Sequence, residues 1–140
     1  MTIDEKQEQV IEEFSAFDDW MDKYAYLIDL GNELEPLDET KKIEANLIDG
    51  CQSQVWFDAE YNNGILIFKA DSDAIITKGI ASLLIRVLSE QTAKDIVNTK
   101  LYFIEQIGLQ QHLSPTRSNG LLSMVKRIKL YAMAYDAKNN

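Results

Sequence analysis

The residues Asn62-Asn63-Gly64, which lie between two strand-like segments, constrain the fold of this chain more than any other feature. Asparagine and glycine tolerate the positive backbone angles that tight hairpins require. Residues 54–61 and 65–70 are therefore predicted to be antiparallel strands. Residues 43–48 show a period of two, as expected of a half-buried strand. We expect these segments to form a small three-stranded antiparallel sheet.

Helical patterns precede this sheet. Thr2 followed by Glu5 is typical of a capping box, which predicts a first helix over residues 3–14. Ser15 is a candidate cap for a second helix, and Gly31 is expected to end that helix in a left-handed conformation. The apolar residues of the second helix recur every three or four positions and are expected to face the core: Phe17, Trp20, Met21, Tyr24, Leu27 and Ile28.

Further helical patterns follow the sheet. A well-buried helix is predicted over residues 76–88, shorter ones over 92–97 and 99–107, and a long one over 118–137. The inner face of the long helix is expected to hold Leu121, Leu122, Val125, Ile128, Tyr131 and Tyr135. The sequence thus predicts a single α+β domain over residues 1–140, with helices flanking the sheet.

Charge and cysteine content narrow the range of partners. The chain has 14 basic and 23 acidic residues, a formal charge of −9 and a pI of about 4.5, so its field repels nucleic acids and anionic lipid surfaces. No segment approaches the roughly 20 apolar residues of a membrane span. With one cysteine, the chain cannot form an internal disulfide or complete a cysteine-based metal site. We expect a soluble cytoplasmic protein without nucleic-acid or membrane partners.

That cysteine, Cys51, is the main candidate for chemistry. It follows Gly50, which lets another molecule approach closely, and precedes the polar residues Gln52 and Ser53, which suit an exposed turn. This setting favours a reactive thiol at a loop tip over an inert buried cysteine. Asp49 and the acidic composition disfavour the thiolate, so activation must come from elsewhere in the fold or from a partner.

Other candidates allow two interpretations each. His112, the only histidine, could act as the base for Cys51, but lone histidines are more often surface or helix-end residues. Arg117 lies near the start of a helix, where the dipole disfavours a cation, so it should pair either with an acid of this chain or with an anionic sulfur or partner carboxylate. Asp71 and Asp73 are interpreted first as helix caps. No metal-binding signature is present, and no metal is expected.

Three segments together resemble a known family. They are Gly50-Cys51-Gln52-Ser53-Gln54-Val55-Trp56, then Asp71-Ser72-Asp73-Ala74 with Lys78-Gly79, and Leu113-Ser114-Pro115-Thr116-Arg117-Ser118-Asn119-Gly120-Leu121. Their residues, order and separation resemble the SufE-type sulfur acceptors, also called cysteine desulfuration proteins, nearly end to end.

The resemblance implies a sulfur carrier. Cys51 would accept sulfane sulfur as a persulfide from a pyridoxal-phosphate cysteine desulfurase, stimulate that enzyme, and pass the sulfur to an iron–sulfur cluster scaffold. Pyridoxal phosphate (PLP) would belong to the desulfurase, and this chain would hold no cofactor. The implied fold is similar to that of IscU-type scaffold proteins. The loop over residues 49–53 would shelter the sulfur, while Asp73, His112 and Arg117 would hold its surroundings or contact the desulfurase.

Two other functions are kept as alternatives. A non-catalytic adaptor would bind the desulfurase without carrying sulfur, and a hydrolase would use Cys51 with His112. The sequence leaves open a homodimer, the final sulfur acceptor, and which of two related desulfurase systems the chain serves.

Overall fold

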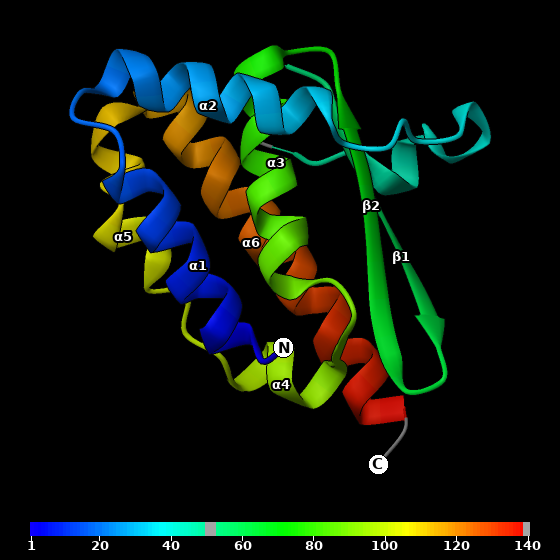
Figure 1. Cartoon of the computed structure of the whole chain (residues 1–140). Helices are drawn as coiled ribbons and strands as arrows, with labels where there is room; N and C mark the ends of the chain where they lie inside the picture. Colours follow the sequence, from blue (N-terminus) through cyan, green and yellow to red (C-terminus); the bar gives the residue numbers. More distant parts are fainter. Residues whose placement is uncertain (50–52, 139–140) are drawn as a thin grey trace.

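The computed structural model describes residues 1–49 and 53–138. It is an α+β fold in which a small sheet lies at the edge of a group of helices (Figure 1). In chain order the elements are α1 (Ile3–Ser15), α2 (Trp20–Asn32), η1 (Glu39–Lys41), η2 (Glu44–Asn46), β1 (Val55–Asn62), β2 (Ile65–Ser72), α3 (Ile75–Leu88), β3 (Gln91–Thr92), α4 (Ala93–Asn98), α5 (Phe103–Gln106), η3 (Gln110–His112) and α6 (Pro115–Lys138).

The predicted hairpin is confirmed. β1 and β2 pair antiparallel along their whole length, from Val55 opposite Ser72 to Asn62 opposite Ile65. Asn63 and Gly64 form the two-residue connection with φ of 51° and 88°. Two positive angles in sequence are typical of the type I′ turn, whose twist matches that of the strands. The sheet is three-stranded and antiparallel, as predicted, in the order β1-β2-β3.

The identity of the third strand was predicted wrongly. Residues 43–48 contain the 3₁₀ turn η2 instead of a strand, and only Leu47 forms an isolated bridge to β1. The side-chain amide of Asn46 donates to the main-chain oxygen of Lys41 at 2.8 Å, a local bond that stabilises a turn. The third strand is β3, which pairs with the other edge of β2.

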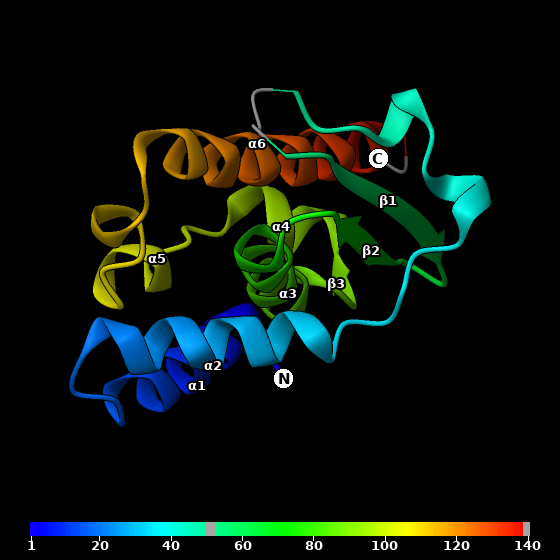
Figure 2. The ribbon, with the colours of Figure 1, turned by 90° about the horizontal axis from the view of Figure 1, so that it is seen from above.

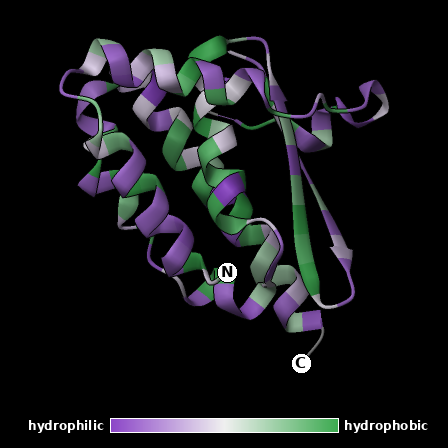
Figure 3. Cartoon of the chain, viewed as in Figure 1, coloured by the Kyte–Doolittle hydropathy of each residue, from purple (hydrophilic) through white to green (hydrophobic). Residues whose placement is uncertain are grey.

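Helix α3 is the centre of the structure. Figure 2 shows α1 and α2 on one side of α3 and α6 on the other, with the sheet beside them. In Figure 3, α3 is mostly hydrophobic, whereas α1 is mostly hydrophilic. The largest fully buried side chains are Phe14, Leu27, Phe57, Leu66, Ile80, Leu83, Leu84, Leu88, Ile96, Phe103, Leu109 and Leu121. Within the described residues, no helix has both the length and the apolar character needed to cross a membrane.

Two glycines allow α2 and α3 to pack closely. A Cβ atom on Gly31 would lie 2.8 Å from the main-chain nitrogen of Gly79, and one on Gly79 would lie 2.3 Å from the carbonyl oxygen of Leu27. Both distances are too short for a side chain. The left-handed helix end predicted at Gly31 is wrong, because this residue lies inside α2, where it allows α3 to approach.

The start of the second helix also differs from the prediction. Ser15 is the last residue of α1, and α2 begins at Trp20. Its cap is Asp19, whose carboxylate accepts a hydrogen bond from the main-chain N–H of Asp22 at 2.9 Å. Met21, predicted to face the core, is 81% exposed because it lies beside the contact face of the helix and not on it.

The long helix begins three residues before the predicted boundary. Ser114 caps it by accepting a hydrogen bond from the Arg117 N–H at 3.3 Å, and Pro115 occupies the first helical position, which needs no donor. Leu122, predicted to face inward, is 50% exposed. Helix α5 covers only Phe103–Gln106 of the helix predicted over residues 99–107, and Gly108, at a φ of 72°, follows its end.

Candidate functional site

The candidate site is described by the two segments on either side of residues 50–52, which are called the cysteine loop below. Gly50, Cys51 and Gln52 lie outside the described residues. The described chain ends at the exposed Asp49 before the loop and resumes at the half-buried Ser53 after it. The geometry given for the site is therefore that of the segments which end at Asp49 and begin at Ser53.

The exit of the loop is held at the start of α3. The main-chain N–H of Gln54 donates to the carboxylate of Asp73 at 3.0 Å, and the Asp73 N–H donates back to the Gln54 oxygen at 3.2 Å. The hydroxyl of Ser72 donates to the same oxygen at 2.8 Å, and the hydroxyls of Ser53 and Thr77 lie 3.3 Å apart. Side chains from the end of β2, the start of α3 and the connection between them thus hold the two residues that follow the loop.

These contacts correct the predicted helix caps. The cap position of α3 is Ala74, and no side-chain hydrogen bond caps this helix. Asp73 instead binds the chain that leaves the loop. Asp71 is buried between Lys42 and Lys78, with N···O distances of 3.3 and 3.5 Å.

The environment of Asp71 favours its charged form. Burial by itself raises the pKa of this carboxyl. Hydrogen bonds from the Ser72 N–H and from Lys42, together with the charge of Lys78, outweigh burial, so the pKa lies below its usual value. Asp71 is thus an ionised link between β2, α3 and the segment that leads to the loop.

The approach to the loop is held by α6. The guanidinium of Arg127 donates to the carbonyl oxygen of Ala45 at 3.0 Å and to that of Leu47 at 2.9 Å. These two carbonyls lie on the segment that leads into the loop, and the planar guanidinium of one arginine binds both. Sequence reasoning missed Arg127, because its partners are main-chain atoms about 80 residues away and leave no trace in the local pattern.

A groove lies beside this approach. It has a volume of about 330 Å³ and runs between α6 and the chain just before the loop. Its walls are formed by Ile48, Asp49, Ser123, Lys126, Arg127 and Leu130. The last described residue before the cysteine thus lines a groove that carries two basic side chains.

The structure places His112 in an aromatic cluster. Its ring stacks on Trp20 with centroids 4.1 Å apart and an angle of 14° between the ring planes, while its Nδ1 lies 2.9 Å from the carbonyl oxygen of Gly108. A carbonyl can only accept, so Nδ1 carries the hydrogen. The hydroxyl of Tyr24 donates to the main-chain oxygen of His112. These contacts join α2 to the segment between α5 and α6.

Arg117 is exposed near the start of α6. Of the two pairings expected for it, the salt bridge with an acid of this chain is not found among the described residues. Within the same residues, no hydrogen bond or ion pair joins His112 or Arg117 to Asp49, Ser53 or Asp73. The structure therefore brings Asp73 against the exit of the loop but links neither His112 nor Arg117 to it through direct contact.

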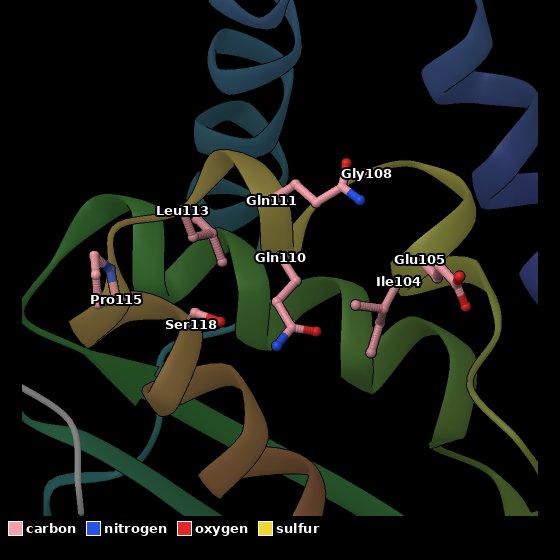
Figure 4. Close-up of a pocket in the computed structure, with 8 residues that line it drawn as sticks. All are labelled: Ile104, Glu105, Gly108, Gln110, Gln111, Leu113, Pro115 and Ser118. Carbon is pink, nitrogen blue, oxygen red and sulfur yellow. The ribbon is translucent and has the colours of Figure 1, made fainter.

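A second, larger hollow of about 580 Å³ lies between α5, η3 and the start of α6. Figure 4 shows Gln110 between Ser118 and Ile104 on its wall. Glu105 is the only ionisable side chain among its described lining residues. Across residues 1–49 and 53–138, no three histidine, cysteine or acidic side chains gather as metal ligands.

Known proteins are similar to this chain over most of its length. The SufE domain, described as "Fe-S metabolism associated domain", matches residues 8–132. A SufE-like protein of Rhizobium etli is 41% identical over 127 residues, which cover 87% of this chain and 86% of that protein. A SufE-like protein of Rhizobium meliloti is 38% identical over 129 residues, covering 87% of this chain and 91% of that protein.

Two further matches extend the comparison. SufE-like protein 1 of Arabidopsis thaliana, a chloroplastic/mitochondrial protein, is 38% identical over 137 residues, which are 95% of this chain but 36% of that protein. The solution structure of a hypothetical protein from Thermus thermophilus has a TM-score of 0.76 and 19% identity, covering 92% of this chain and 94% of that one, and supports the fold alone. The domain match and the Rhizobium relatives both extend over most of the chain, and on this basis the chain belongs to the SufE family, whose domain is associated with iron–sulfur metabolism.

Proposed function

We propose that this protein carries sulfur as a persulfide on Cys51, taking it from a cysteine desulfurase and passing it to an iron–sulfur scaffold. The observation that supports this proposal is the position of Cys51 in a SufE-family chain. The only cysteine lies between two flanks that are held by side chains of other elements, Arg127 before it and Asp73 after it. Such a loop can present a thiol while the rest of the fold stays in place.

The transfer step is a thiol exchange. The Cys51 thiolate attacks the terminal sulfur of the donor persulfide, and a new S–S bond forms at Cys51 as the S–S bond of the donor breaks. The donor cysteine leaves as a thiolate, so no oxidant or reductant is consumed. Removing the persulfide frees the desulfurase for another turnover, which accounts for stimulation. PLP would stay on the desulfurase.

The flanking contacts define how the loop could act. Leu47 and Gln54 are held through their main chains, which confines any rearrangement to the residues between them. We propose that residues 49–53 shelter the bound sulfur and then carry it into a partner. Since such a change would break few contacts outside the loop, its free-energy cost would be local.

The other predicted residues take supporting roles in this proposal. Asp73 holds the exit of the loop. The exposed guanidinium of Arg117 is available to a carboxylate of the desulfurase. His112 is occupied by Trp20 and Gly108, which favours a role in positioning α2 over a role as the base of a hydrolase.

The decisive test is to incubate the protein with a purified cysteine desulfurase, PLP and cysteine, and then measure its intact mass. We expect the added mass of one or more sulfur atoms on the wild type and none on Cys51→Ser. An adaptor would raise desulfurase turnover while staying unmodified, and a hydrolase would cleave esters without any partner. Labelled sulfur followed from cysteine to a purified scaffold tests the second transfer.

Two further expectations belong to this proposal. A similarity to the fold of IscU-type scaffolds, implied by the sequence resemblance, stays a prediction. We also propose a cytoplasmic location, because a sole cysteine without a disulfide partner in the chain suits a reducing compartment.

A further inference from the structure

We propose that the outward face of α6, together with the groove beside Asp49, is the docking surface for the sulfur donor. The matching surface of the donor is an apolar segment that carries carboxylates. The outward face is defined here by four residues: Leu122, Lys126, Leu130 and Met133. This inference rests on the proposed function, because it names the surface through which the same transfer takes place.

Three apolar side chains of the outward face are exposed. Leu122, Leu130 and Met133 are 50%, 49% and 54% exposed. Their spacing of eight and three residues places them on one side of the helix, with Lys126 between the two leucines. Figure 2 shows α6 at the edge of the molecule opposite α1 and α2. A row of exposed large apolar residues on one helix is typical of a protein-binding surface.

The outward face of α6 adjoins the groove beside Asp49. Leu130 and Lys126 belong both to the outward face and to the 330 Å³ groove. Ile48 and Asp49 form the opposite wall of that groove, and Asp49 directly precedes the cysteine loop. A segment bound along α6 therefore lies beside the loop that must receive the sulfur. A concave site next to an apolar row can accept a protruding side chain of the partner.

Positive charge is concentrated on α6. Helix α6 carries five of the fourteen basic residues of the chain and one of its twenty-three acids. Within the described residues, no ion pair involves Lys126, which is exposed at the centre of the outward face. The guanidinium of Arg127 adds positive charge to the groove wall. On a protein with a net charge of −9, this local positive field selects a partner surface that carries carboxylates.

The same charges argue against a second copy as the occupant. A two-fold dimer formed through this face would use the same patch on both molecules, which would bring the Lys126 side chains toward each other. Like charges across an interface are destabilising, and both copies also carry the same net charge of −9. A donor with acidic residues around an apolar segment would instead place carboxylates opposite Lys126.

The test separates docking from sulfur transfer. Binding to a purified cysteine desulfurase is measured with Cys51→Ser protein, in which no transfer can occur, and with the same protein carrying Leu130→Asp or Lys126→Glu. We expect Leu130→Asp to raise the dissociation constant about tenfold or more. Lys126→Glu should weaken binding severalfold and reduce its salt dependence, since it reverses one charge at the surface.

The matched control is Met21→Asp, which places the same acid on the most exposed apolar residue of α2, away from α6. It should bind the desulfurase as tightly as the parent, the Cys51→Ser protein without a second substitution. Circular dichroism and thermal unfolding establish that all variants are folded. Equal binding by every variant overturns the proposal, and so does the absence of binding by the parent.

Two more outcomes separate the docking proposal from a dimer interface and from the proposed carrier function. If sedimentation shows a dimer that Leu130→Asp dissociates, the face binds a second copy and the donor proposal is wrong. If the wild type binds the desulfurase through this face but gains no sulfur, docking stands and the proposed carrier function fails. A small-molecule polysulfide offered to Leu130→Asp protein that retains Cys51 should load it at the wild-type rate, because this reaction needs no docking.

Discussion

The main chain of Gln54 and the residue Asp73 form a reciprocal pair of hydrogen bonds across nineteen positions of the sequence. The Gln54 N–H donates to the Asp73 carboxylate at 3.0 Å, and the Asp73 N–H donates to the Gln54 oxygen at 3.2 Å. The pair joins the end of the cysteine loop to the short connection between β2 and α3. The carboxylate of Asp73 can be removed by mutation without disturbing the core, because this residue is exposed.

Removing that acceptor should loosen the exit of the loop. In Asp73→Ala the Gln54 amide loses its partner, and a net hydrogen bond of about 1 kcal/mol corresponds to an exchange rate about five times higher. Hydrogen exchange of this amide, followed by NMR, measures the change. Asp73→Asn keeps a side-chain oxygen and should exchange like the wild type. An unchanged rate in Asp73→Ala would show that the other contacts hold Gln54 by themselves.

Arg127 should stabilise the approach to the loop. Arg127→Met leaves the Ala45 and Leu47 carbonyls without their charged donor, which we expect to lower the free energy of unfolding by about 1–3 kcal/mol. The stability of Arg127→Lys should lie between those of the wild type and Arg127→Met, since one ammonium group cannot replace the paired donors of a planar guanidinium. Urea unfolding measures the difference. Lys126→Met, at the neighbouring exposed position, should leave stability unchanged, and equal losses at both positions would contradict the assigned contacts.

Gly79→Ala should strongly destabilise the fold. Alanine favours helices by about 1 kcal/mol over glycine, but its Cβ would lie 2.3 Å from the Leu27 carbonyl oxygen and would force α2 and α3 apart. We expect a net loss of at least about 2 kcal/mol by chemical denaturation. Ile75→Ala, at a residue of α3 that is 60% exposed, is the control and should change little. A stabilised Gly79→Ala protein would disprove the close crossing.

The ion pair of Glu13 and Arg86 should give a defined pH dependence. Hydrogen bonding from Arg86 lowers the pKa of the Glu13 carboxyl below its usual value, with an Nη1–Oε1 distance of 2.7 Å. The folded pKa is thus below the unfolded value of about 4.3, so the stabilisation is complete above that pH and is lost as the pH falls through the folded pKa. The pair joins α1 to α3 and is partly exposed, so we expect about 1 kcal/mol.

Comparison of wild type with Glu13→Gln tests this dependence. The difference between their free energies of unfolding should be constant from neutral pH down to about pH 5 and should shrink in more acidic solution. Glu12→Gln is the matched control, because Glu12 is the exposed neighbour on the same helix. A difference that stays constant to low pH would show that Glu13 does not titrate with a lowered pKa.

Local patterns predicted the elements that local forces stabilise. The hairpin follows from Asn63 and Gly64, whose positive φ angles are accessible to these residue types. Thr2 and Glu5 form the predicted capping box, and the apolar face of residues 76–88 matches α3. These features depend on residues a few positions apart, so the sequence contains the relevant information.

The wrong predictions concern segments whose structure depends on contacts with residues far away in the sequence. The period of two in residues 43–48 matches a strand, but the carbonyls of Ala45 and Leu47 bind Arg127 and the segment forms a 3₁₀ turn. Gly31 has the residue type of a helix end, yet it lies inside α2 because Gly79 packs against it. A one-dimensional pattern does not include a partner that is tens of residues away.

For the site, the sequence alone identified Cys51 as the candidate thiol and, through three motifs, its resemblance to the SufE family, which the domain match confirms. Only the tertiary structure showed that Asp73 holds the exit of the loop, that Arg127 holds its approach, and that His112 stacks on Trp20. The physical reason is the range of the interactions involved. Backbone preferences and side-chain chemistry belong to each residue and its neighbours, whereas these hydrogen bonds and ring contacts exist only after folding brings distant segments within a few ångströms.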